Sequence, residues 1–206
     1  MGGAGCRTAR LDPSRSPGLA ATRFEERDLG EYHRRRIRAL SGEDFAEASR
    51  PWLGAPHAPW PTHALDEKSF ASVAPLVQGR ITWLSEIKDL VDWLFLPEPV
   101  VDEKAWAQVI LPGVAELLSD VEKQLSRTEW SVPGIAAALS DVAQSHGLPP
   151  DATESVARVA VTGRAEEGLP LSAALPALGR RRTLARIRAA IGRLPGYEGR
   201  EVSDTR

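Results

Sequence analysis

The sequence lacks the features that define several common classes of protein. No run of eighteen apolar residues occurs among its 206 residues, so we expect no membrane-spanning helix. No apolar stretch follows the first arginines, and we therefore expect no secretion signal and a cytosolic location. The single cysteine, Cys6, lies in a loose N-terminal segment, where we do not expect a reactive thiol.

Residues arranged for metal binding or catalysis are also scarce. The chain has four histidines, none at metal-ligand spacing: His33, His57, His63 and His146. It has neither a phosphate-binding loop that ends in Lys and Ser or Thr nor a nucleophile elbow. Acidic pairs such as Asp66–Glu67 stand at predicted helix starts, where carboxylates interact favourably with the helix dipole. We therefore predict no catalytic residue and no metal site in this chain.

Charge is distributed unevenly along the chain. The formal net charge is −2, yet residues 1–40 carry nine arginines and only five acidic residues. Residues 41–157 carry seven basic and eighteen acidic residues, and residues 158–206 carry ten arginines and five acidic residues. Basic ends suit a phosphate backbone and favour a nucleic-acid partner. A solvated, arginine-rich helix is the alternative interpretation.

The N-terminal third combines a leader, two helical segments and a loop. Residues 1–22 have almost no large apolar side chains, which predicts a disordered leader. The pair Ser41 and Asp44 resembles a capping box and predicts a helix start. Residues 51–64, with four prolines and two tryptophans, are predicted to form a loop. The helix expected before Ser41 has a predicted inward face: Leu29, Tyr32, Ile37 and Leu40.

Apolar residues recur at helical spacing in the middle of the chain. We predict a helix over 67–79, capped by Asp66, and a second one from Ser85 to Leu96. A long helix is expected over 102–127, with a kink at Pro112 and Gly113.

Further helices are expected toward the C-terminus. One begins at Trp130 and Ser131 and ends at Gly147, and others cover 171–178 and 183–194. The apolar, β-branched segment 156–162 is too short to assign as helix or strand. The sequence thus predicts an all-α protein with two packed helical subdomains, 23–128 and 129–194, and a flexible tail, 195–206.

The tryptophans divide into two groups. Trp83, Trp93 and Trp106 fall beside apolar stripe positions and are predicted to lie in the core. Trp52 and Trp60, in the predicted loop, have two open interpretations: stacking on nucleic-acid bases, or packing against neighbouring prolines.

Several segments carry a family resemblance when they are taken in order. They are residues 37–41, 73–87, 102–105, Trp130, 158–163 and 177–179. Together, from about Phe24 to Leu194, they resemble the C-terminal anticodon-binding region of bacterial glutamyl-tRNA synthetases, which are class I aminoacyl-tRNA synthetases. The resemblance implies an all-α cage of two subdomains that grips the anticodon loop of a glutamate-accepting tRNA, and no DNA partner.

The resemblance also implies roles for particular residues. Arg80 matches the arginine that reads the cytosine at the third anticodon position, where a guanidinium can donate to the base edge. A simpler alternative is that Arg80 only pairs with Glu86 or caps a turn. Three residues are implied to contact the anticodon alongside Arg80: Arg158, Thr162 and Arg164. Five arginines are implied to contact phosphates: Arg180, Arg181, Arg182, Arg186 and Arg188.

The chain departs from the family pattern where the catalytic domain would lie. Neither its His-Ile-Gly-His signature nor its Lys-Met-Ser-Lys-Ser loop is present, and the only methionine is Met1. The loop 164–170 is one residue longer than expected. ATP and Mg²⁺ are therefore expected only with a catalytic domain outside this chain, for which a separate polypeptide is one source. Two further interpretations stay open: a free-standing tRNA-binding or regulatory module, and a helical protein-interaction domain.

Overall fold

The computed structural model describes residues 26–109, 113–165 and 169–194. Within these ranges it contains ten α-helices, two short 3-10 helices and no strand, which confirms the all-α prediction. The predicted leader 1–22 and tail 195–206 lie outside the described residues.

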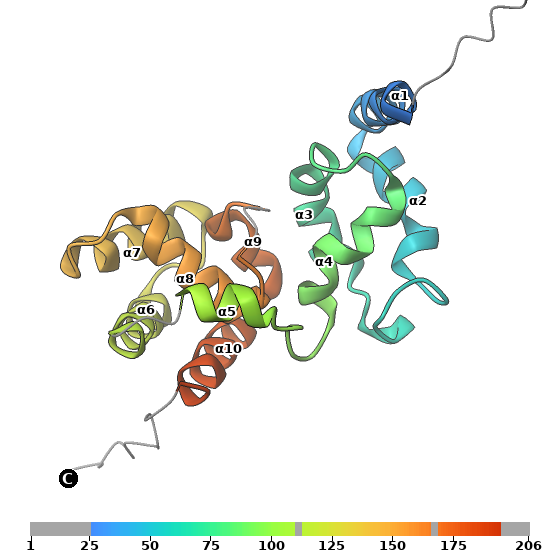
Figure 1. The fold of residues 1–206 in the computed structure, drawn as a ribbon. Helices are drawn as coiled ribbons and strands as arrows, with labels where there is room; N and C mark the ends of the chain where they lie inside the picture. The colour runs from blue at the N-terminus through green and yellow to red at the C-terminus, as the bar shows by residue number, and fades with distance from the viewer. Residues whose placement is uncertain (1–25, 110–112, 166–168, 195–206) are drawn as a thin grey trace, which may run out of the picture.

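The helices form two groups that follow one another along the chain (Figure 1). The first group contains α1 (Glu26–Ala39), α2 (Gly42–Leu53), η1 (Thr62–Ala64), α3 (Glu67–Gln78), η2 (Leu84–Glu86) and α4 (Ile87–Phe95). The second group contains α5 (Glu103–Val109), α6 (Val114–Arg127), α7 (Val132–Ser145), α8 (Pro150–Thr162), α9 (Leu171–Leu178) and α10 (Arg180–Gly192).

The contacts between helices locate the boundary between the two groups. In the first group α2 packs on α3 and α4, and in the second α10 packs on α6, α8 and α9. Helix α6 also packs on α7, although the subdomain boundary expected after residue 128 falls between them. Helices α3 and α9 meet across the junction. We therefore propose a subdomain boundary in residues 96–102, which connect the two groups.

Predicted capping residues begin three of the helices. The Ser41 hydroxyl accepts the Asp44 N–H (3.1 Å) before α2, as the capping box predicts. Asp66 accepts the Lys68 N–H (3.1 Å) before α3, and Ser131 accepts the Gly134 N–H (3.3 Å) before α7. These starts were predictable because each cap lies within three residues of the N–H that it binds.

Two helix boundaries in the first group differ from the sequence prediction. Helix α2 continues through Pro51 to Leu53, where a loop was predicted, because the Leu53 side chain is fully buried in the core. The Trp60 indole N–H then donates to the Leu53 carbonyl (3.1 Å). Ser85 does not cap α4: it lies inside η2, and α4 begins at Ile87.

The second group also differs from the prediction at its helix boundaries. The single helix expected over 102–127 is two helices, because Gly113 has a φ of +89° that an α-helix cannot contain. Residues 156–162 lie in α8, which the sequence left unassigned. The last helix begins at Arg180 and not at Thr183.

The connection between the groups is held by two arginines of α10. Arg182 donates to the carbonyls of Leu94 and Leu96 (both 2.7 Å), at the C-terminal end of α4. Arg186 donates to the Leu96 carbonyl (2.8 Å) and to the Val161 carbonyl (2.9 Å) near the end of α8. Cations are favourable at helix C-termini, so both side chains fix the junction.

Candidate nucleic-acid interface

The turn that follows α3 carries Arg80 on the surface. Its backbone N–H donates to the Val77 carbonyl (2.9 Å), and the next residue, Ile81, is fully buried. Because Ile81 anchors the turn in the core, the Arg80 side chain is exposed. The Glu86 carboxylate accepts the Thr82 backbone N–H (3.0 Å) in the same turn.

Helix α1 braces this turn from the other side. Arg38 donates to the Gly79 carbonyl (2.9 Å), and Arg34 donates to the Thr82 hydroxyl (2.9 Å). Gln78 in return donates to the Ile37 and Leu40 carbonyls (2.8 and 2.9 Å) at the end of α1. The arginine predicted to read a base therefore stands on a turn of fixed shape.

Arg158 and Thr162 lie one turn apart near the end of α8. The Arg158 guanidinium contacts the Glu154 carboxylate and the Leu169 carbonyl. Glu154 also accepts the Leu171 N–H (2.8 Å), so it joins α8 to the start of α9. The Thr162 hydroxyl donates to the Arg158 carbonyl (2.8 Å). The contacts of Glu154 fix the position of Arg158.

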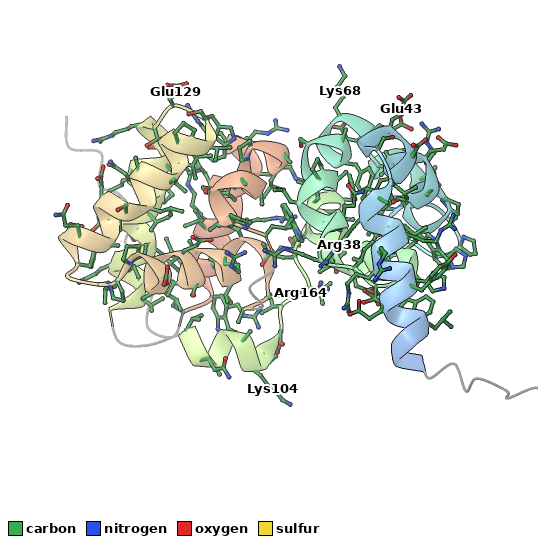
Figure 2. All side chains as sticks on the ribbon, turned by 90° about the horizontal axis from the view of Figure 1, so that it is seen from above. Arg38, Glu43, Lys68, Lys104, Glu129 and Arg164 are labelled. Carbon is green, nitrogen blue, oxygen red and sulfur yellow. The ribbon has the colours of Figure 1, made fainter. Side chains whose placement is uncertain are left out.

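Arg164 links the two helical groups. Its guanidinium pairs with Asp92 of α4 and donates to the Asp89 carbonyl. Figure 2 shows Arg164 at the junction between the groups. Burial raises the pKa of the Asp92 carboxyl, whereas the Arg164 charge acts to lower it. Arg164 therefore has a structural partner as well as its predicted place beside the anticodon.

The structure brings three of the four predicted anticodon contacts together. Arg158, Thr162 and Arg164 line a small cavity of about 50 Å³ that Leu90 and Trp93 of α4 complete. Arg80 lies outside this cavity, at the end of α3. The candidate interface thus has one part on each helical group.

Three of the five predicted phosphate contacts are exposed on α10: Arg180, Arg181 and Arg188. The Arg180 guanidinium lies 5.4 Å from the centre of the Trp130 ring. Arg188 pairs with Glu122 (2.6 Å), and its side chain is 65% exposed. These positions are compatible with weak attraction to a phosphate backbone.

Arg182 and Arg186 differ from the other three. Arg186 is only 5% exposed, and burial lowers its pKa to about 10. Burial also lowers the pKa of Arg182. Because both guanidinium groups already bind the junction carbonyls, a phosphate contact would require breaking those hydrogen bonds. Their positions give them a structural role that the sequence did not indicate.

Two residues that organise the interface were missed from the sequence. Glu154 stands four residues before Arg158, a spacing that favours an ion pair on one helix face and could have revealed it. Asp92 is separated from Arg164 by 72 residues, so only the folded chain brings them together.

Neither a metal centre nor a membrane span is found in the described part of the chain. No three His, Cys, Asp or Glu side chains there are grouped to hold a metal ion. None of the described helices is long and apolar enough to cross a bilayer.

The fold defines an all-α module of two helical groups, with arginines at their junction. Residues 44–191 match the family model of the anticodon binding domain, and the chain belongs to that family. Among its relatives is a glutamate–tRNA ligase of Frankia casuarinae, 46% identical, with 84% of this chain and 37% of the relative covered. A glutamate–tRNA ligase of Thermobifida fusca is 45% identical, with 83% of this chain and 36% of the relative covered.

A solved structure has the same fold. The glutamate–tRNA ligase from Elizabethkingia meningosepticum superposes with a TM-score of 0.72 at 18% identity, covering 83% of this chain and 33% of that one. The chain therefore spans about a third of the length of the ligases that it matches.

Proposed function

We propose that this chain binds the anticodon arm of a tRNA, and that this tRNA accepts glutamate. The observation that carries the proposal is the match of residues 44–191 to the anticodon binding domain. The structure supports it by bringing three of the implied anticodon contacts, Arg158, Thr162 and Arg164, together at the junction of the two groups. The glutamate preference rests on the relatives, which are glutamate–tRNA ligases. A cytosolic location, where tRNA is charged, is part of the same proposal.

The division of work within the interface follows from exposure. Arg80 is exposed on a braced turn and is proposed to read the third anticodon base. Arg158 and Arg164 pair with carboxylates, and the Arg158 side chain is only 11% exposed, so a base contact by either arginine shares the guanidinium with an existing ion pair. Arg180, Arg181 and Arg188 supply attraction without sequence information.

The salt dependence of tRNA binding tests this proposal. If arginine–phosphate contacts contribute, the affinity of the purified chain for tRNA falls roughly tenfold or more from low to moderate salt. Replacing exposed Arg181 by Gln removes one contact and makes the slope of log affinity against log salt shallower by about 0.7 to 0.9. Filter binding or fluorescence anisotropy measures both quantities.

Two results of the salt experiment would contradict the proposal. Failure of the purified chain to bind tRNA at low salt would favour the protein-interaction interpretation. An affinity that does not change with salt would exclude the phosphate contacts. Deletion of residues 180–206 is not a suitable variant, because it removes α10 and its buried Leu184 and Ile187 from the core.

We also expect that the isolated chain forms no glutamyl-adenylate. The sequence has none of the family's ATP-binding signatures, and adenylate formation without positioned phosphate-binding groups proceeds near the uncatalysed rate. The measurement is pyrophosphate exchange in the presence of glutamate, ATP, Mg²⁺ and tRNA. Exchange above a blank without protein would contradict the expectation.

A further inference from the structure

An open groove of about 800 Å³ lies beside the Arg80 turn, on the side of α1. Its walls come from α1, from the end of α2 and from the segment around η2. The residues relevant to its chemistry are Tyr32, His33, Arg36, Trp52 and Trp83. In Figure 2 the N-terminal part of α1 projects beyond the rest of the first group.

Aromatic rings form much of the wall of this groove. The Trp83 and His33 ring centres lie 4.3 Å apart, and Tyr32 meets His33 edge-on at 5.9 Å. Trp83 is 39% exposed and Tyr32 is 51% exposed, so the sequence predictions that Trp83 lies in the core and that Tyr32 faces inward were wrong. Ile81 occupies the core position instead, and the Trp83 ring is left at the surface.

The charge of the groove is positive. The Arg36 guanidinium lies 5.8 Å from the centre of the Tyr32 ring and donates to its hydroxyl (3.1 Å). None of the described residues that line the groove is acidic. Glu31, the nearest carboxylate along α1, pairs with Arg34 (3.2 Å) and does not line it. Aromatic rings beside guanidinium groups are the combination that holds unpaired nucleic-acid bases and their phosphates.

One wall of the groove begins three residues after Arg80, at Trp83. Arg34 joins α1 to Thr82, which lies between them. Three residues of extended chain span at most about 11 Å, so the backbone positions of Arg80 and Trp83 lie within reach of neighbouring nucleotides.

We propose that this groove binds an unpaired base of the tRNA anticodon loop, adjacent to the base that meets Arg80. The base stacks on the exposed face of Trp83, and Arg36 meets the neighbouring phosphate. RNA is favoured over an apolar protein segment because positive charge and exposed rings occur together and no carboxylate lines the groove. This inference rests on the proposed function, since its ligand is part of the same tRNA.

The test replaces Trp83 by Leu and, separately, by Phe. Leucine keeps an apolar side chain but removes the ring, so affinity for a tRNA anticodon stem-loop is expected to fall roughly tenfold at fixed salt. Phenylalanine keeps a ring and is expected to remain within about threefold of the original affinity. Val132 of α7 is 46% exposed and lies in the second group, so Val132→Ser is the control for loss of an exposed apolar side chain. The urea unfolding midpoint of each variant confirms that it folds.

The possible outcomes separate this inference from the proposed function. Weaker binding by Trp83→Leu together with retained binding by Trp83→Phe supports the stacking site. If Trp83→Leu binds the stem-loop as the original chain does, the groove is no RNA site, while the proposed function stands. Equal loss in both variants indicates an apolar contact and overturns stacking. If the original chain binds no tRNA, both the groove site and the proposed function fail.

Discussion

Replacing Gly163 by alanine is expected to destabilise the fold by about 3 kcal/mol or more. Gly163 ends α8 with a φ of +79°, a conformation that costs other residues about 1–2 kcal/mol. An added Cβ would also lie 2.3 Å from the Val100 carbonyl oxygen, which is backbone and cannot rotate away. The Gly163 carbonyl accepts the Asp102 N–H (2.8 Å), and displacing the connection puts that hydrogen bond at risk, at a further cost of about 1 kcal/mol.

Gly147 provides the matched control for this experiment. It follows α7 with a φ of +64°, yet an added Cβ would meet no atom within 4 Å. Gly147→Ala therefore carries the backbone strain alone, about 1–2 kcal/mol. Urea denaturation of both variants measures the difference. Equal losses of stability would show that the connection at residues 96–102 yields easily to the extra methyl group.

Local chemistry explains which parts of the fold could be predicted from the sequence. Ser41, Asp66 and Ser131 each cap a helix within three residues, so their effect does not depend on the rest of the molecule. The buried stripe Phe70, Val73, Ala74 and Val77 follows the helical period and lies in the core as the spacing predicts. Segment 156–162 could not be assigned because helix and strand both bury short apolar runs.

The roles of the arginines depended on distant parts of the chain. Arg182 and Arg186 stand four residues apart, which indicates a shared helix face but not what lies opposite. Their acceptors on α4 and the connection are 86 to 90 residues away. Exposed and buried arginines on α10 therefore look alike in the sequence, although only the exposed ones can meet a phosphate without losing hydrogen bonds.

The exposure of Trp83 also depends on contacts with a distant part of the chain, which the sequence alone does not reveal. In a regular extended segment Ile81 and Trp83, two residues apart, would face the same side, so the exposure of Trp83 shows that this turn departs from the regular pattern. Ile81 is fully buried, whereas the Trp83 ring is partly exposed and packs against His33 of α1. As a result, the candidate interface gains an aromatic surface that composition and periodicity did not indicate.

The exposed arginine at the end of α3 gives the sharpest test of base readout. Arg80→Gln removes the charge and the planar donor group while keeping a similar reach. A lost base contact costs roughly 1–3 kcal/mol, so the preference for a glutamate tRNA over a variant with guanine at the third anticodon position is expected to shrink by roughly one to two decades. The urea unfolding midpoint of the variant, measured beside the original chain, confirms that it folds.

Arg181→Gln is the comparison that separates recognition of the anticodon base from general attraction to phosphates, in the same binding assay. Arg181 is exposed on α10, and a phosphate contact carries no sequence information, so both tRNAs are expected to lose affinity alike. Arg186 would be a poor control, because it is buried and its loss would remove the side-chain donor to the Val161 carbonyl and one of the two donors to the Leu96 carbonyl. Binding of both tRNAs is measured for each variant at one fixed salt concentration. If Arg80→Gln weakens the two tRNAs equally, Arg80 contributes charge and does not read the base.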